Sequence, residues 1–313
     1  MIIASTIEEV RSYVRQWRRE GLSIGLVPTM GALHQGHASL VAASAAQCDR
    51  TVASVFVNPT QFAAGEDLEC YPRDFARDCR ILREKGCHLV FHPTVEEMYP
   101  AGFATYVSPE SDMIRQLCGK DRPGHFRGVC TVVSKLFHIV TPDKAYFGQK
   151  DAQQLAVIRR MVQDLDFDIE VVGCPTVREA DGLAKSSRNA YLSEEERRAA
   201  GVLYRAMEAG RDVIRQERKK QRPPQQQGQE QKVPAVLSGE AAAAETAAGE
   251  RISAAAVLAE MRSVLDSEPM AQIDYVEAVD GKTLLPVASV ESGDLVALAV
   301  QIGKTRLIDN FIV

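Results

Sequence analysis

Two histidines, His34 and His37, flank Gly36, which has no side chain to obstruct a ligand. An apolar run over residues 22–27 precedes them and predicts a buried strand, and the pattern over residues 38–47 predicts a helix. Where a strand turns at glycine into a helix, free backbone N–H groups and the helix dipole attract phosphate. Imidazoles there can donate hydrogen bonds to oxygens that gain charge in phosphoryl or nucleotidyl transfer. The alternative is two histidines that only cap a helix.

The same arrangement recurs with a lysine. Residues 143–147 predict a strand, and the run GQKD at residues 148–151 opens a helix that we expect to reach residue 165. A lysine at the start of a helix opposes the helix dipole, so the position of Lys150 indicates an anionic ligand. Gln154 follows one helical turn later. The alternative for Lys150 is a solvated side chain.

Polar side chains also follow a second predicted strand, residues 51–57. Proline ends this strand and places Asn58 and Gln61 in the loop at its carboxyl end, the edge at which ligands bind in open α/β sheets. Further on, the Gly- and Pro-rich loop of residues 120–128 carries Arg122, which can face an anionic substrate. Both segments are also compatible with ordinary surface loops.

A polar loop at residues 175–189 brings two cations and two hydroxyl groups together. They are consecutive in the chain: Lys185, Ser186, Ser187 and Arg188. Positive charge and hydroxyl donors suit a segment that covers a triphosphate. Alone this pattern is weak, but its order and spacing relative to the two turns strengthen it.

Alternation of strands and helices up to residue 172 predicts an α/β fold, with a Rossmann-like parallel sheet covered by helices on both faces. After Ser193, two helices precede three strands, which predicts a smaller α+β C-terminal lid domain. We therefore expect domains at residues 1–176 and 177–313. A Gln-, Pro- and Ala-rich tract at residues 221–249 has few large apolar groups and predicts a disordered insertion. Capping boxes are predicted at Ser5–Glu8 and at Ser193–Glu196.

Composition excludes several classes of protein. The net charge of −5 argues against a nucleic-acid partner, which would need a basic face. Seven cysteines, an odd number without C-x-x-C spacing, indicate neither a disulfide framework nor a zinc site. No apolar run is long enough to span a bilayer, and the N-terminal pattern is an amphipathic helix rather than a signal peptide. We expect a cytoplasmic protein.

The string PTMGALHQGH at residues 28–37 resembles the HIGH-type signature of the nucleotidyltransferase superfamily. Together with GQKD, the Ser-Ser-Arg loop and the closing TRLIDN at residues 305–310, it resembles the pantoate–β-alanine ligase (pantothenate synthetase) family. The resemblance covers the chain except for the tract at 221–249. It implies ATP-dependent condensation of (R)-pantoate with β-alanine through a pantoyl adenylate, with release of AMP and pyrophosphate. It also implies a homodimer, and Mg²⁺ bound with ATP.

The resemblance further implies roles for individual residues. His34 and His37 lie at the phosphates, with His37 as proton donor, and Lys150 neutralises phosphate charge. Gln61 and Gln154 hold pantoate, Gln61 also lies near β-alanine, and Asn58 and Arg122 belong to this substrate site. Asp78 lies near the magnesium. Lys185 stands where many members have methionine, in a KMSKS-like element. The expected ATP contacts are Met30, Gly31, Ala32, Leu33, His34, Gln35, Gly36, His37, Gly148, Gln149, Lys150, Asp151, Val177, Lys185, Ser186, Ser187 and Arg188.

Other functions remain open at this stage. A cytidylyltransferase or adenylyltransferase acting on a phosphorylated molecule would share the two histidines, but it would place basic residues around the substrate instead of the amides of Gln61 and Gln154. A tRNA ligase conflicts with the acidic chain, which has no evident anticodon-binding domain. A non-enzymatic nucleotide-binding module conflicts with the intact histidines, lysine and Ser-Ser-Arg run.

Overall fold

The computed structural model describes residues 1–63, 65–221 and 252–313. Its N-terminal part is built on a six-stranded sheet in the order β1-β4-β3-β2-β5-β6, and every pair of neighbours is parallel. The strands are β1 (Ile2–Ala4), β2 (Ile24–Thr29), β3 (Arg50–Val55), β4 (Leu89–Phe91), β5 (Lys144–Gly148) and β6 (Glu170–Cys174). The predicted α/β fold class is thus confirmed, whereas β1 was not predicted.

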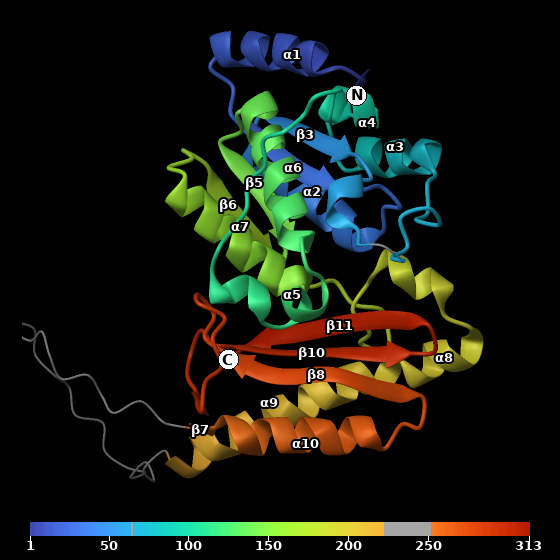
Figure 1. Cartoon of the computed structure of the whole chain (residues 1–313), viewed down its shortest axis with the longest axis vertical. Helices are drawn as coiled ribbons and strands as arrows, with labels where there is room; N and C mark the ends of the chain where they lie inside the picture. Colours follow the sequence, from blue (N-terminus) through green and yellow to red (C-terminus); the bar gives the residue numbers. More distant parts are fainter. Residues whose placement is uncertain (64, 222–251) are drawn as a thin grey trace, which may run out of the picture.

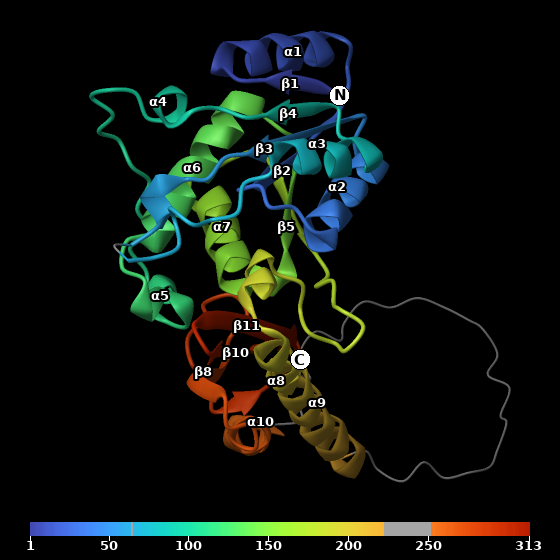
Figure 2. The ribbon, with the colours of Figure 1, turned by 90° about the vertical axis from the view of Figure 1, so that its right-hand side faces the viewer.

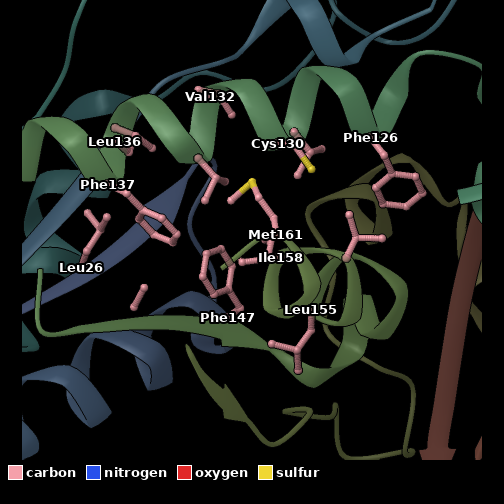
Figure 3. Packing of buried hydrophobic residues seen from close by; sticks show 14 of the residues in the cluster. Leu26, Phe126, Cys130, Val132, Leu136, Phe137, Phe147, Leu155, Ile158 and Met161 are labelled. Carbon is pink, nitrogen blue, oxygen red and sulfur yellow. The ribbon is translucent and has the colours of Figure 1, made fainter. Parts of the chain in front are cut away.

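Helices cover both faces of this sheet (Figure 1). On β2, Leu26 packs in one apolar cluster and its neighbour Val27 in another, because successive strand side chains point to opposite faces. The first cluster includes side chains of α1 (Ile7–Arg19), α6 (His125–Val140) and α7 (Ala152–Asp164). Figure 3 shows residues of α6 and α7 interleaved over β2 and β5. The second cluster contains side chains of α2 (Gln35–Gln47) and α3 (Phe75–Glu84). Burial on both faces explains why the strands are continuously apolar.

The strand order reverses direction at β2. From β2 the chain moves outward through β3 and β4 on one side, and then crosses to β5 and β6 on the other. In open parallel sheets, ligands bind at the carboxyl ends of the strands where the order reverses. This geometry places the β2–α2 turn and the β5–α7 turn next to each other.

The C-terminal part is a second layer structure with its own apolar cluster. Two long helices, α9 (Gly201–Gln221) and α10 (Ala254–Asp266), pack against an antiparallel sheet of β8 (Ala271–Val279), β10 (Leu295–Ile302) and β11 (Thr305–Ile312). The edge strand β11 faces the N-terminal part in both views (Figures 1 and 2). Shorter elements complete the described chain: η1 (Pro59–Gln61), α4 (Val95–Met98), η2 (Asp112–Arg115), α5 (Cys118–Asp121), η3 (Gln149–Asp151), η4 (Ser187–Tyr191), α8 (Glu194–Ala199), β7 (Ile252–Ser253) and β9 (Ser289–Val290).

One of the two predicted capping boxes is confirmed and the other is displaced. The predicted capping box at Ser5–Glu8 is wrong by one residue: Thr6 caps α1, and Glu9 reaches back to its N–H. The capping box at Ser193 and Glu196 is confirmed, but α8 ends at Ala199 and α9 starts afresh.

Three further features predicted from the sequence are the low-complexity tract, the domain boundary and the lack of a membrane span. The tract at 221–249 lies outside the described residues, apart from Gln221, which ends α9. The division into domains at residue 176 stays a prediction. Among the residues that the structure describes, no helix is both long and apolar enough to cross a membrane.

Candidate active site

The β2–α2 turn is held in a strained backbone shape. Gly31 and Ala32 both have positive φ, 83° and 50°. The hydroxyl of Thr29 accepts the N–H of Gly31 and donates to the carbonyl of Ser54, which fixes the end of β2. A Cβ on Gly31 would lie 2.9 Å from Oδ2 of Asp78, so glycine is required there on steric grounds as well.

The carboxylate of Asp78, on α3, holds this turn by hydrogen bonds to its backbone. Its Oδ2 accepts the N–H of Ala32 at 3.0 Å, and its Oδ1 accepts the N–H of Leu33 at 2.8 Å. The side chain is buried, and burial raises the pKa of Asp78 although the two N–H groups act against this shift. Both oxygens therefore have backbone partners, and the predicted proximity of Asp78 to magnesium stays a prediction.

His34 and His37 cap α2 reciprocally. Nδ1 of His34 accepts the N–H of Gly36 at 3.1 Å, and Nδ1 of His37 accepts the N–H of His34 at 3.3 Å. Because each Nδ1 is an acceptor, this hydrogen bonding assigns the ring proton of each histidine to Nε2. Burial, assisted by the charge of Lys150, lowers the pKa of His34 to about 4. Burial and the neighbouring His34 lower the pKa of His37 to about 3. Both rings are neutral Nε2–H donors at pH 7.

The β5–α7 turn supplies the lysine. Lys150 lies in the 3₁₀ turn η3, directly before α7, instead of inside the helix. Its ammonium is 3.4 Å from Oδ1 of Asp151 and its side chain is only 18% exposed. Lys150 is therefore mostly withdrawn from solvent and still has donors available for an anion.

Residues 177–189 form an arm that reaches over both turns, and we call it the lid arm. An antiparallel bridge between Arg178 and Ala184 shapes its base. The Ser187 hydroxyl donates to the carbonyl of Ala32 at 3.1 Å, which docks the arm on the β2–α2 turn. Arg188 makes two hydrogen bonds, 3.1 and 2.9 Å long, to the carboxylate of Asp67. The cation expected at phosphate is thus paired with an acid.

A second network holds Gln61. Asn58 is buried and donates to Oε1 of Gln61 at 3.0 Å, so it acts through Gln61. Arg122 makes two hydrogen bonds, 2.7 and 2.6 Å long, to the carboxylate of Glu66. Nδ1 of His125 lies 2.8 Å from the carbonyl oxygen of Gln61. Burial, with the charge of Arg122, lowers the pKa of His125 to about 4.

These segments meet around one cavity of about 240 Å³. The predicted site residues that line it are Met30, His34, Gly36, His37, Asn58, Gln61, Arg122, Gly148, Lys150, Asp151, Gln154, Val177, Lys185, Ser186, Ser187 and Arg188. The other predicted site residues do not line this cavity: Gly31, Ala32, Leu33, Gln35, Gln149 and Asp78. A larger cavity of about 1160 Å³ lies between the N- and C-terminal parts and shares Lys150, Gln154 and Arg188 with the first.

Comparison with known proteins identifies the family of this chain. The model of the family described as pantoate-beta-alanine ligase matches residues 2–312. The chain belongs to the pantoate–β-alanine ligase family. It is 50% identical over 312 residues to the pantothenate synthetase of Moorella thermoacetica, covering 100% of this chain and 98% of the relative.

Two solved structures of the same family resemble this ligase closely. The pantothenate synthetase from Thermus thermophilus superposes with a TM-score of 0.85 at 44% identity, covering 100% of this chain and 99% of the other. The pantoate-beta-alanine ligase from Francisella tularensis, complexed with beta-gamma ATP and beta-alanine, gives a TM-score of 0.72 at 31% identity and covers 100% and 97%.

Sequence reasoning missed part of the cavity of this ligase. An apolar wall of α6 lines it, formed by Val129, Val132, Val133 and Leu136. Their spacing was visible as one helical face, but the same spacing is typical of ordinary core residues. Glu66 and Asp67, the acidic partners of Arg122 and Arg188, were also missed. No local sequence pattern predicts a contact between residues that are 56 or 121 positions apart.

Proposed function

We propose that this ligase condenses pantoate with β-alanine in two steps, with ATP converting pantoate to pantoyl adenylate before the amine reacts. A carboxylate is a poor electrophile toward an amine, because oxide would have to leave. Transfer of adenylate makes AMP the leaving group. The observation that carries the proposal is the convergence of both strand–turn–helix units and the lid arm on one cavity.

In the first step a carboxylate oxygen of pantoate bonds to the α-phosphorus of ATP, and the bond from that phosphorus to the bridging oxygen of pyrophosphate breaks. His34 and His37 then donate hydrogen bonds from Nε2 to phosphate oxygens that gain charge. Their lowered pKa values make them neutral donors, so the role of His37 is donation of a hydrogen bond. Lys150 neutralises charge on the triphosphate.

Arg188 completes the phosphate site after a change of partner. Because Arg188 is paired with Asp67, binding of phosphate to its guanidinium requires exchange of this carboxylate for a phosphate group. A phosphate group offers the same paired acceptors to a guanidinium and more negative charge. Ser186 lies beside Arg188 in the cavity and adds a hydroxyl donor, whereas the hydroxyl of Ser187 donates to the carbonyl of Ala32.

Pantoate has a carboxylate, two hydroxyl groups and a carbon that carries two methyl groups. The amides of Gln61 and Gln154 suit the polar groups, and the wall formed by Val129, Val133 and Leu136 suits the methyl groups. The amine of β-alanine then bonds to the carbonyl carbon of the adenylate, and AMP leaves together with one proton. Arg122 lines both this cavity and the larger one, from which β-alanine can enter, and it contacts the carbonyl of Gln61.

Magnesium is expected with the nucleotide. The described residues contain no cluster of three or more His, Cys, Asp or Glu side chains suited to hold a metal on their own. Mg²⁺ prefers octahedral oxygen ligands and often keeps waters and phosphate oxygens with few protein ligands. Asp151 is the acidic side chain of the described lining and can contact such an ion. The ion would reduce the charge repulsion between pantoate and triphosphate.

Exchange of labelled pyrophosphate into ATP tests the two-step route. We expect exchange with Mg²⁺ and pantoate in the absence of β-alanine, and discharge to pantothenate and AMP once β-alanine is added. A cytidylyltransferase would use CTP instead, and a binding module would show no exchange. Strict dependence of exchange on β-alanine would contradict a separable adenylate.

A further inference from the structure

The closing motif TRLIDN has no role in the proposed chemistry, yet three of its residues are buried and polar: Thr305, Asp309 and Asn310. Asp309 is 1% exposed and Asn310 is 7% exposed, on the edge strand β11. Burying polar groups is unfavourable unless they are hydrogen-bonded, so the partners of this pair indicate its purpose.

Asn310 reaches across to the N-terminal part. Its Nδ2 donates to the carbonyl of Gln149 at 3.1 Å and to the carbonyl of Lys150 at 2.8 Å. Both protons of one amide are thus available for two successive carbonyls of η3, the turn that carries the catalytic lysine. A backbone held at both carbonyls fixes the position from which the side chain of Lys150 extends.

Asp309 points the other way and reaches the lid arm. Its two oxygens accept from the guanidinium of Arg178 at 2.6 and 3.0 Å. Arg178 also donates to the carbonyl of Gly182 at 2.9 Å, which braces the base of the arm. The backbone N–H of Asn310 donates to Oδ1 of Asp309 at 2.8 Å, so the backbone of Asn310 also holds this carboxylate.

Strand alternation explains how one strand supports two segments. Leu307 and Phe311 pack in the C-terminal apolar cluster, on the same face as Asp309. Ile308 packs against the N-terminal cluster, on the same face as Asn310. In Figure 1, β11 lies between the two parts of the chain.

We propose that Asp309 and Asn310 are positioning residues for adenylate formation: Asn310 holds the turn of Lys150, and Asp309 holds the lid arm of Arg188 through Arg178. This inference rests on the proposed function, because it assigns Lys150 and Arg188 to the triphosphate. It goes further in making the C-terminal strand a part of the phosphate site.

The test measures pantoate-dependent pyrophosphate exchange in a double-mutant cycle. Asn310→Leu keeps the size of the side chain but removes both donors. We expect exchange to fall by about tenfold to 10²-fold, because a small displacement of a catalytic group has this effect. In a Lys150→Ala background the same change should alter the rate by less than about twofold, since its target is gone. In an Arg188→Ala background the loss should persist.

Controls separate this effect from loss of fold and from failure of the proposed function. Ile312→Ala changes an exposed residue on the same face of β11 and should leave exchange unchanged. If Asn310→Leu does not melt cooperatively, Asn310→Ala, which lets water reach the carbonyls, is measured under the same criterion. Lys150→Ala alone tests the role of Lys150: normal exchange in that variant would remove Lys150 from the chemistry and the inference with it.

The inference is overturned separately if Lys150→Ala slows exchange but Asn310→Leu lowers the rate by the same factor in both backgrounds. Asp309→Asn provides the reciprocal measurement, since its loss should vanish in the Arg188→Ala background and persist in the Lys150→Ala background. Equal losses of Asp309→Asn in both backgrounds would exclude a role through the lid arm.

Discussion

Each of the two histidines in the HIGH-type turn has two roles, which its two ring nitrogens divide between them. Nδ1 of each ring caps α2, and Nε2 remains for the ligand. Capping therefore selects the tautomer that can donate to phosphate. The same residues stabilise the helix and prepare the site.

Replacing His37 by asparagine separates these duties. Oδ1 of asparagine can take the place of Nδ1 as acceptor, but no donor reaches the position of Nε2. His37→Asn should keep the melting temperature and lower pyrophosphate exchange by about 10²–10³-fold, the loss typical of one donor at a charged transition state. His37→Ala should lose activity and also part of the stability. A folded His37→Asn variant with normal turnover would remove His37 from the mechanism.

The lowered pKa values of His34 and His37 predict how stability depends on pH. Unfolded histidines titrate near 6.5, whereas these two do so at about 4 and about 3 in the folded chain. Between these values the unfolded state binds more protons, so stability falls as pH is lowered from about 6.5 towards 4. Denaturant titrations should show a shallower decline for a variant with both His34→Asn and His37→Asn. An unchanged slope would contradict the assignment.

Replacement of Gln154 should weaken the binding of pantoate but not the binding of ATP, the other substrate of the first step. Removing its amide leaves polar groups of bound pantoate without a partner, so Gln154→Ala should raise the KM for pantoate by roughly tenfold or more. The KM for ATP should change little. Gln163→Ala, an exposed residue on the same helix, is the matched control. A selective loss of ATP affinity would assign Gln154 to the nucleotide instead.

Among the helices, α3 stabilises the β2–α2 turn, from which it is distant in the sequence. Asp78 accepts two backbone N–H groups from residues 32 and 33, one of which has a positive φ. Backbone in this region is unfavourable for alanine and persists only where the surroundings enforce it. The carboxylate of Asp78 thus stabilises the strained turn, and the N–H groups of the turn supply the hydrogen-bond partners that a buried carboxylate needs.

Asp78→Asn should therefore lower the maximal rate of pyrophosphate exchange without changing the Mg²⁺ concentration that the enzyme requires. Asparagine offers one oxygen in place of two, so one N–H of the turn loses its partner, and a buried unpaired group costs about 1–3 kcal/mol. Exchange measured over a range of Mg²⁺ concentrations should show a lower maximal rate and an unchanged half-saturating concentration. Recovery of the full rate at high Mg²⁺ would instead make Asp78 a metal ligand.

In the whole molecule, residues from both parts of the chain complete the site, and the two parts share apolar packing, since the N-terminal cluster also includes Tyr275, Leu295 and Ala297 of the C-terminal sheet. Asn310 and the lid arm bring C-terminal residues to turns of the N-terminal sheet. The predicted homodimer, the cytoplasmic location and the domain boundary stay predictions, and sedimentation measurements would test the first.

Deleting residues 222–249 and inserting a short flexible linker should leave the enzyme intact. The tract has too few large apolar residues to build a core, so its loss removes little stabilisation. We expect the melting temperature to change by less than about 2–4 °C, the shift that roughly 1 kcal/mol produces in a domain of 150–250 residues. A large drop in melting temperature or in turnover would show that the tract packs or acts.

Features that depend on near neighbours in the chain could be predicted from the amino-acid sequence. Strand–glycine–helix patterns located both turns, His34, His37 and Lys150, since apolar runs and helix starts are local signals. They also predicted the parallel sheet and the C-terminal α+β layer. The capping box of α1 was displaced by one residue, because Ser5-Thr6 and Glu8-Glu9 offer two registers and only packing selects one.

Contacts between side chains that are distant in the sequence could not be predicted and became apparent in the folded chain. The pairs Arg188–Asp67, Arg122–Glu66 and Arg178–Asp309 join residues 121, 56 and 131 positions apart. Sequence patterns carry no information about such distances, because folding brings these groups together through packing of elements that are themselves non-polar at their contacts. For the same reason Asn310 was visible only as part of a motif, and its donors to Gln149 and Lys150 emerged when β11 was placed against the sheet.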